Sequence, residues 1–257
     1  MADFIFDFWE SQARRFEDNP EASWGDKFAL SLESIEISKQ ISLAGNSILD
    51  VGCANGFAIF DQARKFNEKK FTGVDFSPEM ILNANRSLAN LDSSLSERCS
   101  FKVMDARNLE FEDETFDCVY TTRTLINLPN WEEQKRAIAE CMRVTKKSGV
   151  TVFSEGFFEP LVLLNAMRAL LGLKPLVEHD FNRYLKLEKV KSFLELSKLE
   201  YKEINFSSLY YFGTRIVREL ATSDNAFTSE FNERFYRIEK EFDGGNLGIQ
   251  KVIVVYR

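Results

Sequence analysis

The sequence is poor in the residues that most often mark metal centres and disulfide frameworks. Its 257 residues include one histidine and four cysteines, and no two cysteines have the C-x-x-C spacing of a zinc or redox site. Three of the four lie in or beside apolar stretches, as buried thiols do in a reducing compartment. We therefore expect no metal site and no disulfide among Cys53, Cys99, Cys118 and Cys141.

Long apolar runs and an excess of positive charge are also missing. No run reaches the roughly 18 residues of a membrane-spanning helix, and no charged-then-apolar secretory leader begins the chain. The net charge is −7 and the pI about 5.1, so the electrostatic footprint of a nucleic-acid-binding protein is lacking. We expect a cytoplasmic protein with no nucleic-acid partner and no membrane partner; its oligomeric state stays open.

Phenylalanine is abundant instead, and strand and helix patterns alternate along most of the chain. The 24 phenylalanines indicate a bulky aromatic core or pocket. The alternation predicts an α/β fold with a mostly parallel sheet and helices on both faces. It stops after residue 155, where a helical segment is inserted at about 156–184. The expected strands are 48–51, 70–75, 100–104, 116–121, 150–154, 202–208 and 249–256.

The most informative stretch is SILDVGCANGF, at 47–57. An apolar strand runs into a turn between Gly52 and Gly56, and a helical pattern begins directly after it. A strand, a glycine-bearing turn and a helix N-terminus let a nucleotide approach the backbone N–H groups. The dinucleotide pattern G-x-G-x-x-G fails, because Ala54 and Phe57 stand where its second and third glycines would be.

Acidic residues lie at the ends of four of the first five predicted strands. They are Asp50, Asp75, Asp105 and Glu155. In an open parallel sheet, ligands bind beyond the carboxyl ends of the strands. An acid at the end of the second strand can accept both ribose hydroxyls of an adenosine, and we expect this role of Asp75.

The motif D-V-G-C-A-N-G at 50–56, with acids at the next strand ends, resembles the class I S-adenosylmethionine (SAM)-dependent methyltransferases. The departure is Ala54, where many members carry glycine; alanine is the mildest replacement, provided that φ is not positive. The SAM-site resemblance covers about 20–155. More loosely, 123–128 and 154–173 look like a branch found in bacterial surface-polysaccharide and small-metabolite pathways. The resemblance implies a Rossmann-like, seven-stranded, mostly parallel sheet with an antiparallel last strand.

The same resemblance implies SAM as the cofactor and assigns its contacts residue by residue. Asp105 would accept from the adenine amino group, with the Ala106 N–H beside it, and Phe76 and Met80 would line the adenine slot. The leading helices close over SAM in relatives, which brings in Trp24. The implied cofactor contacts are Asp50, Gly52, Ala54, Asn55, Gly56, Asp75, Phe76, Met80, Asp105, Ala106, Thr121 and Trp24.

We expect the acceptor beside the fourth strand end and under the insertion. An arginine at a ligand-facing strand end, such as Arg123, suits a carboxylate or phosphate. Asn165 and Arg168 are three residues apart and share one helix face. The expected acceptor contacts are Arg123, Asn127, Asn165, Arg168, Asn182 and Tyr184.

Two side chains are candidates for a general base: His179, the only histidine, and Glu155. We predict one domain, 1–257, with N-terminal helices in 1–44 and an acceptor-covering insertion at about 156–184. The predicted activity is in-line methyl transfer from SAM to an O or N atom of a small, anionic metabolite or nucleotide-linked sugar. A nicotinamide-dependent Rossmann oxidoreductase and a non-catalytic SAM-binding protein are the alternatives.

Overall fold

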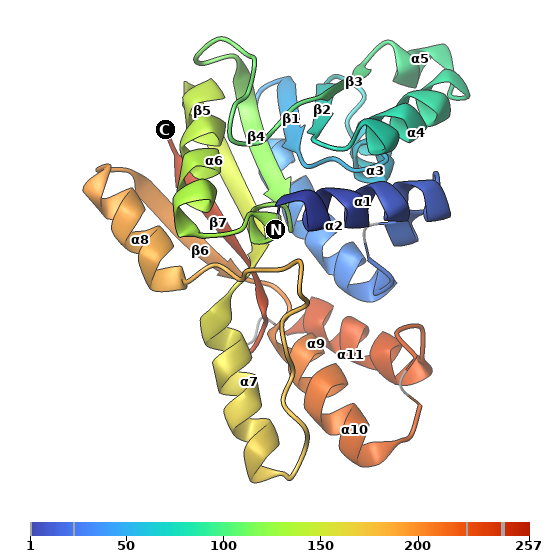
Figure 1. Ribbon diagram of the computed structural model, residues 1–257, viewed down its shortest axis with the longest axis vertical. Coiled ribbons are helices and arrows are strands. Elements are labelled where there is room, and N and C mark those ends of the chain that lie inside the picture. Colours follow the sequence, from blue (N-terminus) through green and yellow to red (C-terminus); the bar gives the residue numbers. More distant parts are fainter. Residues whose placement is uncertain (1, 23, 225, 243–244) are drawn as a thin grey trace.

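The computed structural model describes residues 2–22, 24–224, 226–242 and 245–257, and its centre is one seven-stranded sheet (Figure 1). The strand order is β3-β2-β1-β4-β5-β7-β6; β7 runs antiparallel to β5 and β6, and the other neighbours are parallel. This confirms the predicted Rossmann-like sheet with its antiparallel last strand. The strands are β1 (Ser47–Val51), β2 (Lys70–Asp75), β3 (Cys99–Val103), β4 (Phe116–Thr122), β5 (Thr145–Gly156), β6 (Glu200–Asn205) and β7 (Gln250–Tyr256).

Helices cover both faces of this sheet because each presents one apolar stripe to it. The stripe of α6 (Trp131–Val144), for example, is Ala137, Ile138, Cys141 and Val144, at helical spacing. On this face α6 is joined by α8 (Leu187–Leu196). The opposite face is covered by α2 (Lys27–Leu43), α3 (Phe57–Lys65) and α4 (Pro78–Ala89).

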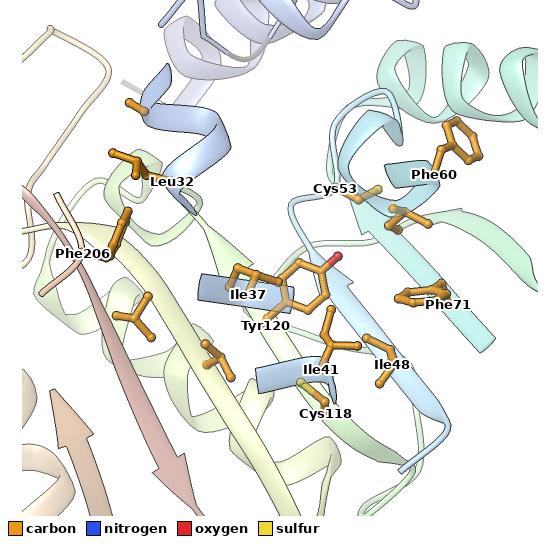
Figure 2. Close-up of a cluster of buried hydrophobic side chains, with 14 of the residues drawn as sticks. Leu32, Ile37, Ile41, Ile48, Cys53, Phe60, Phe71, Cys118, Tyr120 and Phe206 are labelled. Atoms are coloured by element: carbon orange, nitrogen blue, oxygen red, sulfur yellow. The ribbon is translucent and has the colours of Figure 1, made fainter. Parts of the chain in front are cut away.

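The core on the α2 side is aromatic, as the phenylalanine content predicts. Figure 2 shows Tyr120 of β4 at its centre, between Ile37 of α2 and Ile48 of β1. Phe71 and Phe60 extend the same cluster toward β2 and α3. The side chain of Tyr120 also lines the cavity described below. This part of the core therefore supports the cavity wall.

Most of the remaining helices lie at the carboxyl ends of the strands; the short α5 (Ser93–Ser96), just before β3, lies at the amino ends. Between β5 and α8, α7 (Phe158–Leu170) extends away from the sheet and contacts η3 (Gly213–Val217). Figure 1 shows it beside α9 (Ser208–Phe212) and α10 (Arg218–Ala221). In the described part of the chain, no helix is long and apolar enough to cross a bilayer. The other elements are α1 (Ala2–Phe16), η1 (Pro20–Ala22), η2 (Leu125–Asn127) and α11 (Glu230–Glu241).

Candidate functional site

A cavity of about 980 Å³ lies at the carboxyl ends of the parallel strands. One half is bounded by α1 and by the loops that follow β1, β2 and β3. The other half is bounded by α2, the segment after β4, and the chain between β5 and α8. Its volume is at the upper end of the roughly 300–1,000 Å³ of small-molecule sites, so there is room for a cofactor and a second small molecule.

The loop after β1 leaves one side of the cavity free of bulky side chains. Gly52, Ala54 and Gly56 all have positive φ, at +83°, +47° and +79°. A Cβ on Gly52 would lie 2.0 Å from the Thr124 hydroxyl oxygen, so no other residue fits there. Because φ of Ala54 is positive, alanine is not a harmless replacement for glycine at this position, and Ala54 carries backbone strain. Its N–H is held by a hydrogen bond to Asp75 Oδ2 at 2.9 Å.

We expect Ala54→Val to lower stability by about 1–2 kcal/mol, because a β-branched residue is poorly accommodated at positive φ. Ala54→Gly removes the strain but adds chain entropy to the unfolded state, so its stability should stay within about 1 kcal/mol of the parent. Urea denaturation of the three proteins measures both differences. Equal stability of the valine variant and the parent would contradict the strained backbone.

Asp50 presents a buried carboxylate to the cavity without a counter-charge in contact. It is 1% exposed, and among the described residues neither oxygen has a hydrogen-bond partner of acceptable geometry. Burial raises the Asp50 pKa to about 8, which the nearby Tyr120 hydroxyl only partly offsets. An uncompensated buried carboxylate is suited to a cationic ligand group. The amino group of SAM is such a cation, so Asp50 fits the implied cofactor.

Asp75 is positioned by the backbone and keeps acceptor capacity for a ligand. Its Oδ1 accepts from the Ser77 N–H and its Oδ2 from the Ala54 N–H, both at 2.9 Å. Burial raises the Asp75 pKa to about 6 against these two hydrogen bonds. A carboxylate oxygen can accept more than one hydrogen bond, so both oxygens remain able to receive ribose hydroxyls.

Asp105 also reaches the cavity, but it has a partner that the sequence did not reveal. Arg107 donates through Nε to both of its oxygens, at 2.9 and 3.1 Å, and also contacts Glu133. Burial by itself raises the Asp105 pKa, yet the bonds from Arg107 outweigh it and lower that pKa. Ala106, Phe76 and Met80 line the same half of the cavity, where an adenine was expected.

The N-terminal helix α1 closes this half and is fixed by side chains from the strand-end loops. Asn55 Nδ2 donates to the backbone oxygens of Glu17 and Asn19, both at 2.9 Å. The Ser77 hydroxyl donates to Glu10 at 2.6 Å. Trp9 of α1 lines the cavity, and its buried indole N–H has no partner among the described residues. This N–H is therefore available to a ligand.

In the other half of the cavity, the positive charge of Arg123 is already neutralised by a carboxylate. Its Nε donates to Glu33 Oε2 at 3.1 Å, and its guanidinium lies over Trp24, 5.1 Å from the ring centre. Glu33 is buried, and its other oxygen accepts from the Ser154 hydroxyl at 2.7 Å. Asn127 Nδ2 donates to the Arg123 carbonyl, while its buried Oδ1 has no partner in the described part of the chain. Both Arg123 and Asn127 line the cavity.

The structure places five of the predicted contact residues outside the cavity wall, which corrects those assignments. Glu155 accepts from the Thr121 hydroxyl and from three backbone N–H groups at the start of η2, so both residues lie behind the wall. Gly56 begins α3 against Phe101. The remaining two, Asn165 and Arg168, bond the backbone that follows α7.

The other predicted residues of the insertion do reach the cavity. His179, Asn182 and Tyr184 line it together with Phe181. The ring of His179 stacks on Phe181 at 5.2 Å, and Phe181 in turn stacks on Phe8 of α1 at 4.2 Å. The segment before α8 and the N-terminal helix thus meet over the site.

Comparisons with known proteins agree with this geometry. A family model described as "Methyltransferase domain" matches residues 48–149. The sterol 4-C-methyltransferase strm-1 of Caenorhabditis elegans is 33% identical over 49% of this chain and 36% of its own length. A ubiquinone biosynthesis O-methyltransferase of Pseudomonas putida is 27% identical over 65% of this chain and 70% of its own. Each sequence match therefore spans only part of the relative.

A solved structure extends the likeness to the whole fold. Magnesium protoporphyrin IX methyltransferase from Synechocystis PCC 6803, solved with bound S-adenosylhomocysteine (SAH), covers 100% of both chains with a TM-score of 0.63. At 13% identity this likeness concerns the fold alone. Three findings agree on one family: the matched domain, the fold, and the three aspartates that follow the strands and line one cavity. Residues 48–149 thus form a methyltransferase domain, and the chain has the fold of the class I SAM-dependent methyltransferases, whose methyl donor is SAM.

Proposed function

We propose that this protein transfers a methyl group from SAM to an apolar small-molecule acceptor. The observation that carries the cofactor half is the buried, unpartnered carboxylate of Asp50 at the cavity wall. The observation that carries the acceptor half is the apolar character of the opposite wall, whose side chains include Trp24, Ile37, Leu161, Leu176, Tyr211 and Ile249.

The arginines support an apolar acceptor rather than the anionic one predicted from sequence. Among the described residues, those lining the cavity are Arg107, Arg123 and Arg215. Each is paired with a carboxylate; the partner of Arg215 is Asp26, at 3.0 Å. Arg168, the other arginine of the predicted anion clamp, lies outside the wall. An anionic acceptor would therefore have to compete with ion pairs that already exist.

The names of the relatives support the same class of acceptor. One sequence relative is named for a sterol, a largely apolar molecule, and the other for ubiquinone biosynthesis. Neither name implies a nucleotide-linked sugar. The predicted transfer to an O or N atom fits the second name, an O-methyltransferase, and the cytoplasmic location remains a prediction.

SAM supplies a methyl group already activated for displacement, so the chain mainly has to align two molecules and exclude water. Asp50 would hold the cationic amino group and Asp75 the ribose. Residues 156–184, within the single domain that we propose, cover the acceptor. Where the acceptor atom carries a proton that must leave, His179 is the candidate base, because it lines the cavity and Glu155 does not.

Transfer of labelled methyl groups into a cell extract tests this function. With the enzyme and methyl-labelled SAM, label should appear in the organic phase after solvent partition and be strongly reduced with Asp50→Asn. Label confined to the aqueous phase would contradict the apolar acceptor. SAH binding without any label transfer would instead favour the non-catalytic SAM-binding alternative, and NADH binding without SAH binding the oxidoreductase.

A further inference from the structure

Helix α7 is apolar on both of its faces, but only one face is covered. Its inner residues Leu161 and Leu164 are buried. The outer residues recur at helical spacing from Val162 to Leu170, Leu171 follows directly at the end of the helix, and all are exposed. A helix that is apolar all round is normally buried on all sides. We define the α7 outer face as Val162, Leu163, Ala166, Ala169, Leu170 and Leu171.

This outer face carries no charge. The charged residues of α7 are Glu159 and Arg168. Arg168 is buried and paired with Glu219 at 2.8 Å, and Glu159 accepts from the backbone N–H of Leu187 at 2.9 Å. Leu170 is 88% exposed. Contiguous exposed apolar surface of this kind marks a site of interaction with a protein or a membrane.

The segment that follows α7 leads from its exposed end to the cavity. Val177 lines the cavity and is nevertheless 77% exposed. The side chain of Asn165 binds the backbone N–H and carbonyl of Leu176, at 2.8 and 2.9 Å, and Arg168 Nε donates to the Lys174 carbonyl at 2.7 Å. The polar residues of α7 thus fix the segment that joins its exposed end to the cavity.

We propose that the α7 outer face and Val177 dock on the surface of a lipid bilayer, with the apolar side chains inserted at the interface. The C-terminal end of α7 lies at the lower extremity of the molecule in Figure 1, so it can enter a bilayer without obstruction from the sheet. Lys174, exposed next to this end, can place its amino group among lipid phosphates while its stem stays apolar.

A bilayer fits this surface better than a second copy of the chain does. The surface ends at the rim of an apolar cavity, and a lipid phase is where an apolar acceptor is dissolved. The choice of a bilayer as the occupant rests on the proposed apolar acceptor, whereas vesicle binding can be measured without any methyl transfer. The sequence predicted no membrane partner because it shows the absence of a spanning helix but not the exposure of α7.

Flotation with phosphatidylcholine vesicles tests the docking surface. The wild-type protein should float with the vesicles, also in high salt, because apolar insertion is not screened. The double variant Leu163→Glu/Leu170→Glu should bind at least about 10-fold more weakly. The matched control is Leu196→Glu, which changes an 85%-exposed leucine on α8 and should bind as the wild type does.

Two further measurements make the result decisive. SAH binding by calorimetry should be equal in all three proteins, which shows that folding and the cofactor site are intact. Absence of vesicle binding by the wild type, binding that salt abolishes, or binding kept by the double variant would each overturn the proposal. So would a wild-type dimer in sedimentation that the double variant breaks while vesicle binding is absent, because the surface would then be a subunit interface.

Discussion

Asp50→Asn is expected to weaken SAH binding about 100-fold and, at the same time, to stabilise the ligand-free protein. The carboxylate is buried, lines the cavity and has no counter-charge and no hydrogen bond of acceptable geometry among the described residues, although the Tyr120 hydroxyl lies near it. Loss of one partner of a buried charge pair costs roughly 2–5 kcal/mol of binding. The same charge is unfavourable when the ligand is absent, so its removal should add about 2 kcal/mol to the free energy of unfolding at pH 8.

The pH dependence of stability tests independently whether the ionised Asp50 destabilises the ligand-free protein. Burial raises the Asp50 pKa to about 8 from 3.8. A carboxyl group whose folded pKa is raised contributes stability that is complete below about pH 4 and is lost as the pH rises to 8. The free energy of unfolding of the wild type should therefore fall between these values more steeply than that of Asp50→Asn.

Asp61→Asn is the matched control for these measurements. Asp61 also lines the cavity, but it is paired with Lys65 at 2.6 Å and its side chain is 41% exposed. Its substitution should change neither SAH binding nor stability appreciably. Weak SAH binding by Asp61→Asn, or an Asp50→Asn variant that binds SAH as the wild type does, would contradict the role of Asp50.

Glu155→Ala is expected to lower the free energy of unfolding by about 4 kcal/mol, because it leaves several buried donors without an acceptor. Glu155 is fully buried and accepts from the Thr121 hydroxyl at 2.7 Å. It also accepts from the N–H groups of Thr124, Leu125 and Ile126 at 3.1–3.3 Å. These bonds tie the turn that carries Arg123 and Asn127 to the end of β5.

Glu155→Gln separates this positioning role from a catalytic one. Glutamine keeps one acceptor oxygen, so its loss of stability should be about half that of alanine. At a temperature where Glu155→Gln is folded, kcat should stay within a few-fold of the wild type, because the side chain is outside the cavity wall. A Glu155→Gln protein of full stability with no turnover would show that Glu155 acts as the base.

The cofactor half of the site could be predicted from sequence because its residues follow strands. The carboxyl ends of parallel neighbours meet at one edge, so Asp50, Asp75 and Asp105 converge on one cavity whatever the details of packing. The pairing of Arg123 with Glu33 could not be predicted in this way, because the two residues are 90 positions apart. Without knowledge of that pairing, the sequence predicts a free anion clamp at Arg123.

The acceptor half was harder to predict, because helical spacing shows which residues share one side of a helix but not what that side contacts. Asn165 and Arg168 do share a side of α7, yet that side holds the following backbone and Glu219 rather than a ligand. Likewise, the apolar residues of α7 predicted a helix without showing that one face is uncovered. Both features depend on contacts with the chain after residue 170.

Calorimetric titration of the wild-type protein with SAH, at pH 7 in two buffers of different ionisation enthalpy, tests the central claim most directly. We predict one SAH per chain and the release of about one proton, because Asp50 must ionise from a pKa of about 8 to accept the amino group. NADH should not bind. SAH binding without proton release, or no SAH binding at all, would contradict the assignment of this cavity.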